Sequence, residues 1–501
     1  MNVGVLTDEH IERVGEVPLM VFEGEEISNV SIRDNSNRLG SALKDLGIRE
    51  DDVVAISMSN CPQVFESFGA VFRIGGIALP ILFVLKEEEC RFILEDSGAV
   101  AVITDTVLAD KMLAASEGLD GVRQIIVVGG EDTDRTLSYE KLMAESTPDL
   151  EMVDKNPEDV AIIMYTSGTT GKPKGVLLTH ENLITCAKSA YVSNEQEEAK
   201  TSLMCLPMAH IFGVAGMNTA LFSEFPDTRI VVMRWYEPEE CMRLIQEYRV
   251  NLFPAVPTMF SLIVNHPNVD NYDLSSLEDC VAGAAPLPLE LRRAFMDKFG
   301  CEMRQLYGLT ESTGMGTIYR PSMSWKDGSV GKPYEYMEMK IFDDSDNELP
   351  PGKIGEVVIR GPQVMKGYHN RSEETAEALR GGWLHTGDVG YLDEEGYLFI
   401  TDRKKDIIIK GGENIMPTQI EDKIYEHPAV AEAAVIGVTD PTYGEEIVAC
   451  VALKPGMEAT PEELMEFCRE NIPTFKQPKE VRILETLPKS SIGKILKREL
   501  R

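Results

Sequence analysis

The chain has 501 residues, 43% of them hydrophobic, which is enough for about three folding units with buried cores. Lys and Arg number 49 against 83 Asp and Glu, and the resulting net charge of −34 excludes a surface that attracts nucleic acid or acidic lipid. The longest apolar run, Ile74 to Leu85, is too short and too broken by Gly and Pro to cross a bilayer.

The chain ends and the cysteines indicate a compartment. The start, MNVGVLTDEH, lacks a basic stretch followed by an apolar one, and the end, KRELR, is not a known address signal. Nine cysteines, an odd number without any Cys-x-x-Cys pair, predict free thiols in a reducing environment. We therefore expect a cytoplasmic protein with no membrane insertion, no nucleic-acid partner and no thiolate-bound metal.

From about residue 50 to residue 320, apolar runs rich in β-branched residues alternate with segments of helical periodicity. PQVFESFGAVFRI and EPEECMRLIQEYR are two such helical segments. Apolar strands separated by helices predict parallel sheets covered on both faces, which is an α/β architecture. The expected strands are DVVAISMSN, AVAVITD, RQIIVVGG, VAIIMYTS, TSLMCLP, TRIVVM, VNLFPAV and EDCVAGA.

After about residue 320 the strands become shorter and more alternating. KIGEVVIRG and GYLDEEGYLFITD indicate a small antiparallel β module, with DEEG as a hairpin turn. After DRKKD, the strands EAAVIGV and EIVACVAL and the helices MPTQIEDKIYEHP and TPEELMEFCREN indicate a compact α+β unit with a basic tail. We place a domain boundary near Arg403.

The stretch YTSGTTGKPKGV directly follows the apolar strand VAIIMY. Its glycines allow backbone N–H groups to turn inward, its hydroxyls add donors, and Lys172 and Lys174 add positive charge, which together suit a polyphosphate. The following segment, THENLITCAKSAYV, is predicted to be a helix with Thr179 as its N-cap. A Walker A loop is excluded, because it would need Gly at Thr166 and Ser or Thr at Pro173. An ordinary flexible surface loop is the alternative.

These twelve residues closely resemble the phosphate-loop signature of the adenylate-forming superfamily, which includes acyl-CoA synthetases, peptide-synthetase adenylation domains and beetle luciferases. The resemblance runs from about residue 25 to the C-terminus and is closest to the acyl-CoA synthetases of fatty or aromatic acids. Five further segments match in the family's order: VAGAAPLP, QLYGLTES, GWLHTGDVG, DRKKDIIIKGGENIMPTQIE and LPKSSIGKILKREL.

The resemblance implies roles for the matched residues. Tyr307 would stack on adenine, Thr310 would hold the α-phosphate or the carboxylate, and Glu311 would ligate Mg²⁺. Asp388 would bind the ribose hydroxyls, and Lys494 would be the catalytic lysine. Taken singly, these residues have structural alternatives: a core tyrosine, a solvated carboxylate, a turn former and one more charge in a basic helix. The set implied to bind ATP or AMP is Thr166, Ser167, Gly168, Thr169, Thr170, Gly171, Lys174, Gly283, Ala284, Ala285, Tyr307, Gly308, Thr310, Asp388, Arg403 and Lys494.

The resemblance also implies the architecture. A large N-terminal domain, residues 1–402, would contain two doubly wound, mainly parallel sheets in about residues 1–320 and a small antiparallel β-barrel-like module in about residues 321–402. Residues 403–405 would form a hinge, and residues 406–501 a small mobile α+β lid.

Lys405 would be the pivot about which the lid rotates after adenylation. In relatives this rotation brings another face of the lid to the thiol tunnel. Gly411 and Gly412 fall on that face, where the lack of side chains would leave room for coenzyme A, and Asn414 would join them at this site. An ordinary β-turn is the alternative for the two glycines.

The segment LPMAHIFG resembles the acyl-pocket entrance of the family and places His210 beside the substrate carboxylate, with a structural histidine as the alternative. Amino-acid-activating relatives carry an aspartate in this element, whereas MAHIF has no acid. The adjoining FGVAGMNTALF is apolar. An acid with an uncharged tail is therefore expected, whether fatty, alicyclic or aromatic.

The expected activity is that of an AMP-forming acid–thiol ligase. ATP, coenzyme A and a small carboxylic acid would be substrates, and Mg²⁺ the cofactor. Two alternatives stay open: a stand-alone adenylation enzyme that loads a carrier protein, and a non-catalytic nucleotide-binding module. A homodimer is compatible with either reading.

Overall fold

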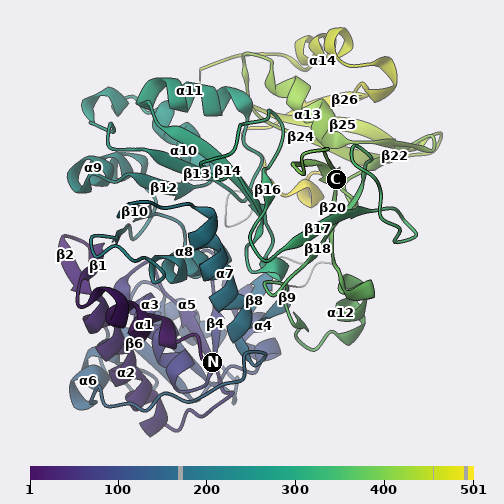
Figure 1. Cartoon of the computed structure of the whole chain (residues 1–501). Coiled ribbons are helices and arrows are strands. Elements are labelled where there is room, and N and C mark those ends of the chain that lie inside the picture. Colours follow the sequence, from purple (N-terminus) through teal and green to yellow (C-terminus); the bar gives the residue numbers. More distant parts are fainter. Residues whose placement is uncertain (167–172, 455, 490–494) are drawn as a thin grey trace. The chain divides into compact units, whose positions relative to one another are not determined.

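The computed structural model describes residues 1–166, 173–454, 456–489 and 495–501 (Figure 1). The chain divides into two compact units, one made of Met1–Glu338 and Ile359–Leu384, the other of Met339–Val358 and His385–Arg501. The domain limits at residue 402 and the hinge at residues 403–405 stay predictions. Within the described ranges, no helix combines the length and the apolar character that a bilayer span requires.

The first unit contains an eight-stranded sheet, counted over the described residues, in the order β19-β9-β8-β4-β3-β5-β6-β7. The strands from β8 to β7 run parallel, whereas β9 is antiparallel to β8 and β19 is antiparallel to β9. The bounds are β3 Val53–Ser57, β4 Ile77–Pro80, β5 Ala101–Asp105, β6 Gln124–Val128, β7 Leu137–Ser138, β8 Val160–Thr166, β9 Lys174–Thr179 and β19 Gly367–Tyr368.

A second large sheet in this unit has nine strands among the described residues, in the order β16-β15-β14-β13-β12-β10-β11-β1-β2. Its centre, from β14 to β1, is parallel, and antiparallel strands close both edges. The bounds are β1 Pro18–Phe22, β2 Glu25–Ser28, β10 Thr201–Met204, β11 Arg229–Val232, β12 Leu252–Ala255, β13 Asp279–Ala282, β14 Glu302–Gly308, β15 Gly316–Ile318 and β16 Lys332–Pro333.

Apart from α12, in which no residue is buried, the helices of this unit bury apolar residues. In α9 (Pro238–Tyr248) the residues Cys241, Met242, Leu244 and Ile245 are buried at helical spacing, as an amphipathic surface helix requires. Helices α2 and α3 run side by side, as do α7 and α8 (Figure 1). The other bounds are α1 Val5–Val14, α2 Asn29–Asp45, α3 Pro62–Arg73, α4 Glu87–Ser97, α5 Ala109–Ala115, α6 Tyr139–Glu145, α7 His180–Ser193, α8 Ile211–Ala220, α10 Pro257–Val264, α11 Leu289–Phe299 and α12 Ser372–Ala378.

The second unit contains most of a four-stranded sheet and an α+β region. The four strands are β17 (Glu338–Phe342), β18 (Gly355–Arg360), β20 (Leu384–Leu392) and β21 (Leu398–Arg403). The α+β region pairs β24 with β25 along ten registered positions, and α13 packs on β24. Its bounds are β22 Ile408–Lys410, β23 Glu413–Ile415, α13 Pro417–Tyr425, β24 Val430–Asp440, β25 Gly444–Leu453, α14 Pro461–Asn471 and β26 Glu480–Ile483.

The expected fold class is confirmed. Each of the eight strand-like runs between residues 50 and 320 contains a strand. In β3 and β5 every residue is buried, as expected for strands covered on both faces of a sheet. Thr179 caps α7 with its side chain, and the DEEG turn joins β20 to β21. The parallel sheets, the separate antiparallel sheet and the C-terminal α+β region all match the expectation.

One strand was not predicted from the sequence. Strand β9 lies in the chain between residues 167–172 and helix α7. Thr166 and Lys174 are Cα partners at the open end of the β8–β9 ladder. Residues 167–172 therefore lie in the chain between two antiparallel strands, and Thr166 and Lys174 on either side of them are held together by backbone pairing.

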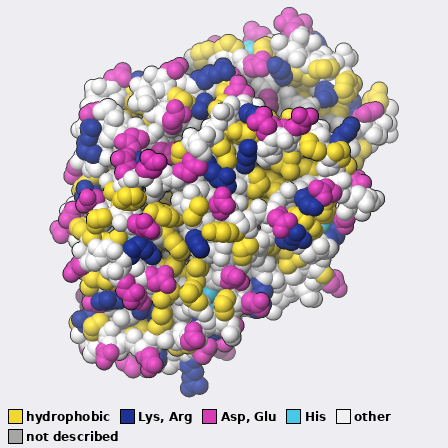
Figure 2. Space-filling view, viewed as in Figure 1, with side chains coloured by type: hydrophobic (Ala, Val, Ile, Leu, Met, Phe, Trp, Pro, Cys, Tyr) yellow, Lys and Arg dark blue, Asp and Glu magenta, His cyan; other side chains and the backbone are white. Residues whose placement is uncertain are grey.

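The acidic residues are spread widely over the face shown in Figure 2, and Lys and Arg side chains lie among them. Several basic side chains are engaged with acids; Lys155 Nζ, for example, lies 3.0 Å from Glu50 and 2.7 Å from Asp51. A polyanionic ligand of such a protein needs cations placed locally for it.

Two buried histidines predict a loss of stability in mild acid. Burial is the main cause that lowers the pKa of His10 and of His180 from 6.5 to about 4. Both stay neutral in the folded state, whereas the unfolded chain protonates them below about pH 6.5. Their contribution to stability is therefore complete above about pH 6.5 and is lost as the pH falls toward 4. Urea unfolding between pH 5 and 7 should show this slope, and His180→Gln should reduce the slope by about one proton. An unchanged slope would contradict the assignment.

Candidate active site

One end of the predicted phosphate loop, Lys174, lies beside a tyrosine from a distant part of the chain. Lys174, the first residue of β9, places its Nζ 5.1 Å from the centre of the Tyr368 ring. The Tyr368 hydroxyl donates to Glu311 Oε1 at 3.0 Å. Lys174 and Glu311, which the sequence analysis named in different segments, therefore both contact Tyr368. Ser167, Gly168, Thr169, Thr170 and Gly171 lie outside the described residues.

Glu311 lies in the short 3₁₀ helix η2 (Thr310–Ser312), which follows β14 and contacts β9. Its main-chain oxygen accepts from Met365 N at 2.8 Å. The turn before it is tight, because a Cβ on Gly308 would lie 2.0 Å from the carbonyl oxygen of Gly314. Glycine is therefore required at position 308, whatever this turn binds.

The predicted adenine turn and the acyl-pocket segment lie together in the same unit. Gly283 follows β13, and a Cβ built on it would approach Leu306 Cδ1 to 2.7 Å and Phe212 Cε1 to 3.1 Å. Ala284 has a φ of 66°, a left-handed conformation that is uncommon for a residue with a side chain. Strands β13 and β14 are parallel neighbours. Gly283 to Ala285 follow the end of β13, and Tyr307 is the next-to-last residue of β14, so they lie at the carboxyl ends of adjacent strands.

His210 caps the N-terminus of α8, where its Nδ1 accepts from Phe212 N at 3.3 Å. Burial lowers the pKa of His210 to about 4. The ring is therefore neutral near pH 7, with its proton on Nε2, because Nδ1 is the acceptor. A neutral N–H donor suits a carboxylate or phosphate oxygen without adding a charge.

In the second unit, Asp388 and Arg403 face each other across the β20–β21 ladder. The Arg403 Nε donates to Asp388 Oδ1 at 2.7 Å, and the Asp388 side chain is 4% exposed. The two residues predicted to contact the nucleotide are thus partners of each other. Lys405 follows two residues later, and its carbonyl accepts from Arg501 at 3.4 Å.

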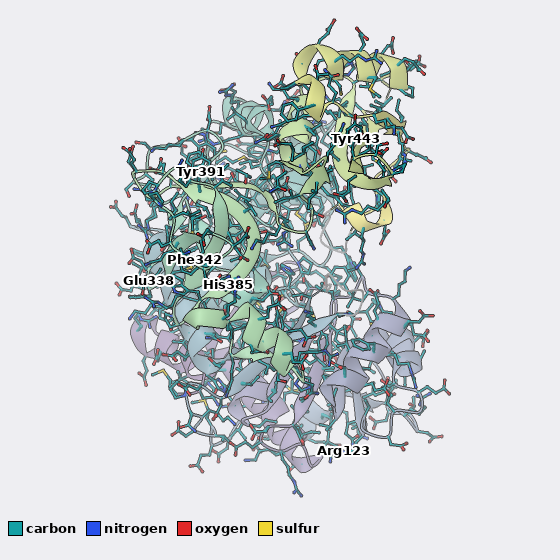
Figure 3. The ribbon with its side chains drawn as sticks, turned by 90° about the vertical axis from the view of Figure 1, so that its right-hand side faces the viewer. Arg123, Glu338, Phe342, His385, Tyr391 and Tyr443 are labelled. Atoms are coloured by element: carbon teal, nitrogen blue, oxygen red, sulfur yellow. The ribbon has the colours of Figure 1, made fainter. Side chains whose placement is uncertain are left out.

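A buried carboxylate that sequence reasoning missed supports the turn before Asp388. Glu356 accepts from Gly387 N at 3.1 Å and from Lys404 Nζ at 3.1 Å, and its Oε2 lies 3.1 Å from His385 Nδ1. Burial opposes its ionisation, but His385 and Lys404 outweigh burial and hold the pKa of Glu356 below its usual value. The His385 ring is packed near Phe342, with 6.2 Å between ring centroids (Figure 3).

Gly411 and Gly412 form the two-residue turn between β22 and β23, with φ values of 60° and 89°. Positive φ at both positions is typical of a type I′ hairpin, so the β-turn alternative explains why they are glycines. Asn414 is the Cα partner of Ile409 in this hairpin. Contact of these residues with coenzyme A stays a prediction.

Lys494 also lies outside the described residues, but both flanks of its segment are placed. Lys489 and Ile495 form an antiparallel bridge, and Leu496 N donates to Pro488 O at 2.8 Å. Further along, Lys497 Nζ lies 2.8 Å from Glu421 on α13. The residues on both sides of 490–494 are therefore held in place by contacts within the second unit.

The residues present fit a magnesium ion of the kind that accompanies ATP. Mg²⁺ usually takes one or two carboxylates together with substrate phosphates and water. Glu311 offers one carboxylate, and the described residues contain no cluster of three or more potential protein ligands. An ion held partly by the substrate's own phosphates is the arrangement that suits such a site.

Comparisons with known proteins agree with the fold. The sequence model of the AMP-binding enzyme family matches residues 7–369, and that of the AMP-binding enzyme C-terminal domain matches residues 419–494. The chain is 35% identical to a long-chain-fatty-acid–CoA ligase of Bacillus subtilis, covering 99% of this chain and 93% of that protein. It is 36% identical to a feruloyl-CoA synthase of an Amycolatopsis species, covering 93% and 91%.

A similar solved structure is that of the anthranilate CoA ligase AuaEII in complex with anthranoyl-AMP. It has a TM-score of 0.93 and 26% sequence identity, and the match covers 100% of this chain and 96% of that one. The expected superfamily is confirmed. The chain belongs to the AMP-binding enzyme family, and it is an enzyme of the AMP-forming acid–thiol ligase type.

Proposed function

We propose that the chain is an ATP-dependent acid:CoA ligase, which converts a fatty, alicyclic or aromatic acid into acyl-AMP and then into acyl-CoA. The observation that carries the proposal is the contact of Lys174 and Glu311 with Tyr368, which links the phosphate loop to the predicted metal ligand. The named activities of the relatives, on long-chain fatty acids and on feruloyl groups, support this substrate range.

The chemistry explains why an acidic protein needs these cations. A carboxylate is a poor acyl donor, and formation of acyl-AMP replaces a hydroxide-like leaving group with a phosphate ester. The carboxylate must first approach the α-phosphorus of a polyanion, and one pair of like charges at about 4 Å costs roughly 4 kcal/mol at an effective dielectric of 20. At 1.36 kcal/mol per factor of ten, that repulsion alone slows the reaction about a thousandfold.

Each residue has a proposed part in meeting that charge. Lys494 would offset the negative charge of the carboxylate and the α-phosphate oxygens, and Thr310 would donate to one of these oxygens. His210 donates its Nε2–H to the carboxylate and stays neutral. Glu311 would ligate Mg²⁺, which when bound would supply positive charge to the phosphates. The segment from Thr166 to Lys174 would bind the β- and γ-phosphates, which leave as pyrophosphate.

The remaining proposed ATP contacts are those with the base and the ribose. We assign the adenine to the edge formed by Gly283 to Ala285 and Tyr307, and the ribose hydroxyls to Asp388. Arg403 already donates a hydrogen bond to the Asp388 carboxylate. The ribose hydroxyls would therefore either displace Arg403 or share the carboxylate with it. The turn at Gly411 and Gly412 would then face the pantetheine arm in the thioester step.

The test is acid-dependent ATP–pyrophosphate exchange across a panel of fatty, alicyclic, aromatic and amino acids. Exchange with uncharged acids, followed by AMP release on addition of coenzyme A, is the expected result. Release with a phosphopantetheinyl carrier protein but not with coenzyme A would favour the carrier-loading alternative. No exchange with any acid would overturn the proposal, and an amino acid as the best substrate would overturn the reading of His210.

A further inference from the structure

Tyr368 is placed by its backbone next to the strand that begins with Lys174. It is the second residue of β19 and is the Cα partner of Val176 in β9. The following residue, His369, donates its N–H to the carbonyl of Gly175 at 2.7 Å. This strand pairing and this hydrogen bond therefore fix the backbone of Tyr368 relative to the start of β9.

The Tyr368 side chain points from this strand to Glu311. Its hydroxyl donates to Oε1 at 3.0 Å, although the two residues are 57 positions apart in the chain. A hydrogen bond to an ionised carboxylate is stronger than a neutral one, and it fixes the plane of the carboxylate. The other oxygen, Oε2, keeps its capacity to ligate a cation.

The two parts of the Tyr368 side chain contact different groups. The ring faces the Lys174 ammonium at 5.1 Å, a distance at which the ring attracts a cation electrostatically. The hydroxyl donates its hydrogen bond to Glu311. Removal of the hydroxyl and removal of the ring should therefore have separable effects.

We propose that Tyr368 is a positioning residue whose hydroxyl orients Glu311 toward the metal ion of the nucleotide and whose ring holds Lys174 for the phosphates. This role rests on the proposed function, because it takes Glu311 as the metal ligand. It explains why a phenol is placed here: a phenylalanine would keep the ring contact and a serine would keep only a hydroxyl.

The test measures metal binding directly. Mn²⁺ replaces Mg²⁺, and its binding to the enzyme with a non-hydrolysable ATP analogue is followed by electron paramagnetic resonance. Tyr368→Phe should weaken Mn²⁺ binding about tenfold, as the loss of a group that orients a ligand usually does. Its affinity for the metal-free analogue should be unchanged. Tyr368→Leu should weaken metal binding equally and also weaken the metal-free analogue about threefold, because Lys174 loses the ring.

Tyr139→Phe is the matched control. The Tyr139 hydroxyl donates to the buried carboxylate of Glu66 at 2.7 Å in the same unit, so this variant removes a similar hydrogen bond elsewhere. It should leave Mn²⁺ binding unchanged. If the natural enzyme binds Mn²⁺ with the analogue and Tyr368→Phe binds it equally well, the positioning role is overturned and the proposed function stands. If the natural enzyme binds neither Mn²⁺ nor the ATP analogue, the positioning role and the proposed function are both overturned.

Discussion

Lys494→Ala should reduce acyl-AMP formation about a thousandfold, while thioester formation from synthetic acyl-AMP and coenzyme A should change less than tenfold. The first number follows from the repulsion between carboxylate and phosphate, about 4 kcal/mol, which the lysine is proposed to offset. The second follows from the proposed division of labour, in which the lid rotates and Lys494 leaves the reaction centre. The measurements are acid-dependent ATP–pyrophosphate exchange and release of AMP from acyl-AMP.

Lys479→Ala is the control for a lysine in the same unit. Its side chain is 63% exposed, and its Nζ lies 2.9 Å from Asp440. Exposed ion pairs of this kind contribute less than about 1 kcal/mol, so both half-reactions should stay within about twofold of the natural enzyme. Equal loss of both half-reactions in Lys494→Ala, with the fold retained, would contradict the division of labour between two lid positions.

The strands of the parallel sheets could be predicted because their signal is local. Runs such as VVAIS in β3 and AVITD in β5 are buried at every position, and β-branched residues in short apolar runs fit no other element as well. The N-cap at Thr179 was equally local, since a capping side chain and its partner at Asn182 are three residues apart.

Pairing between distant segments could not be predicted in the same way. Met20 in β1 is the partner of Ile230 in β11, and neither run carries a mark that selects the other. Strand β9 was missed because its six residues directly follow a loop with strong turn signals and directly precede a helix. The antiparallel pairing of β8 with β9, which brings Thr166 next to Lys174, therefore could not be predicted either.

The residues of the candidate site also fall into two groups, those with a local sequence signal and those without one. Lys174, Glu311 and Asp388 were named through segments that resemble a family. Their neighbours Tyr368 and Glu356 were not, because each acts through a contact that forms only on folding: Tyr368 with Glu311, and Glu356 with Gly387 and Lys404. The only signal for Tyr368 was an aromatic residue after a glycine in VMKGYHN, which is also typical of a surface turn.

Glu311→Gln should lower acid-dependent exchange about a hundredfold at a Mg²⁺ concentration that saturates the natural enzyme. The amide has the shape of the carboxylate, and its oxygen still accepts from Tyr368, so the local structure should persist. What it loses is the negative charge, and neutral oxygens ligate hard divalent cations less strongly than carboxylates do. Raising Mg²⁺ should restore part of the rate, which loss of an ordinary structural contact would not allow.

Glu66→Gln is the control for this prediction, because it removes a tyrosine-bound carboxylate that has no proposed metal. Glu66 is 3% exposed and accepts from Tyr139 at 2.7 Å and from Asn35 at 2.8 Å, so it matches Glu311 as a carboxylate held by a tyrosine. Its replacement should leave the Mg²⁺ dependence of exchange unchanged, whatever it does to the stability of the unit. If Glu311→Gln keeps the natural rate at every Mg²⁺ concentration, the metal is held elsewhere. The role of Tyr368 would then reduce to packing, because an oriented carboxylate with no cation to ligate does nothing for the charge that the reaction must overcome.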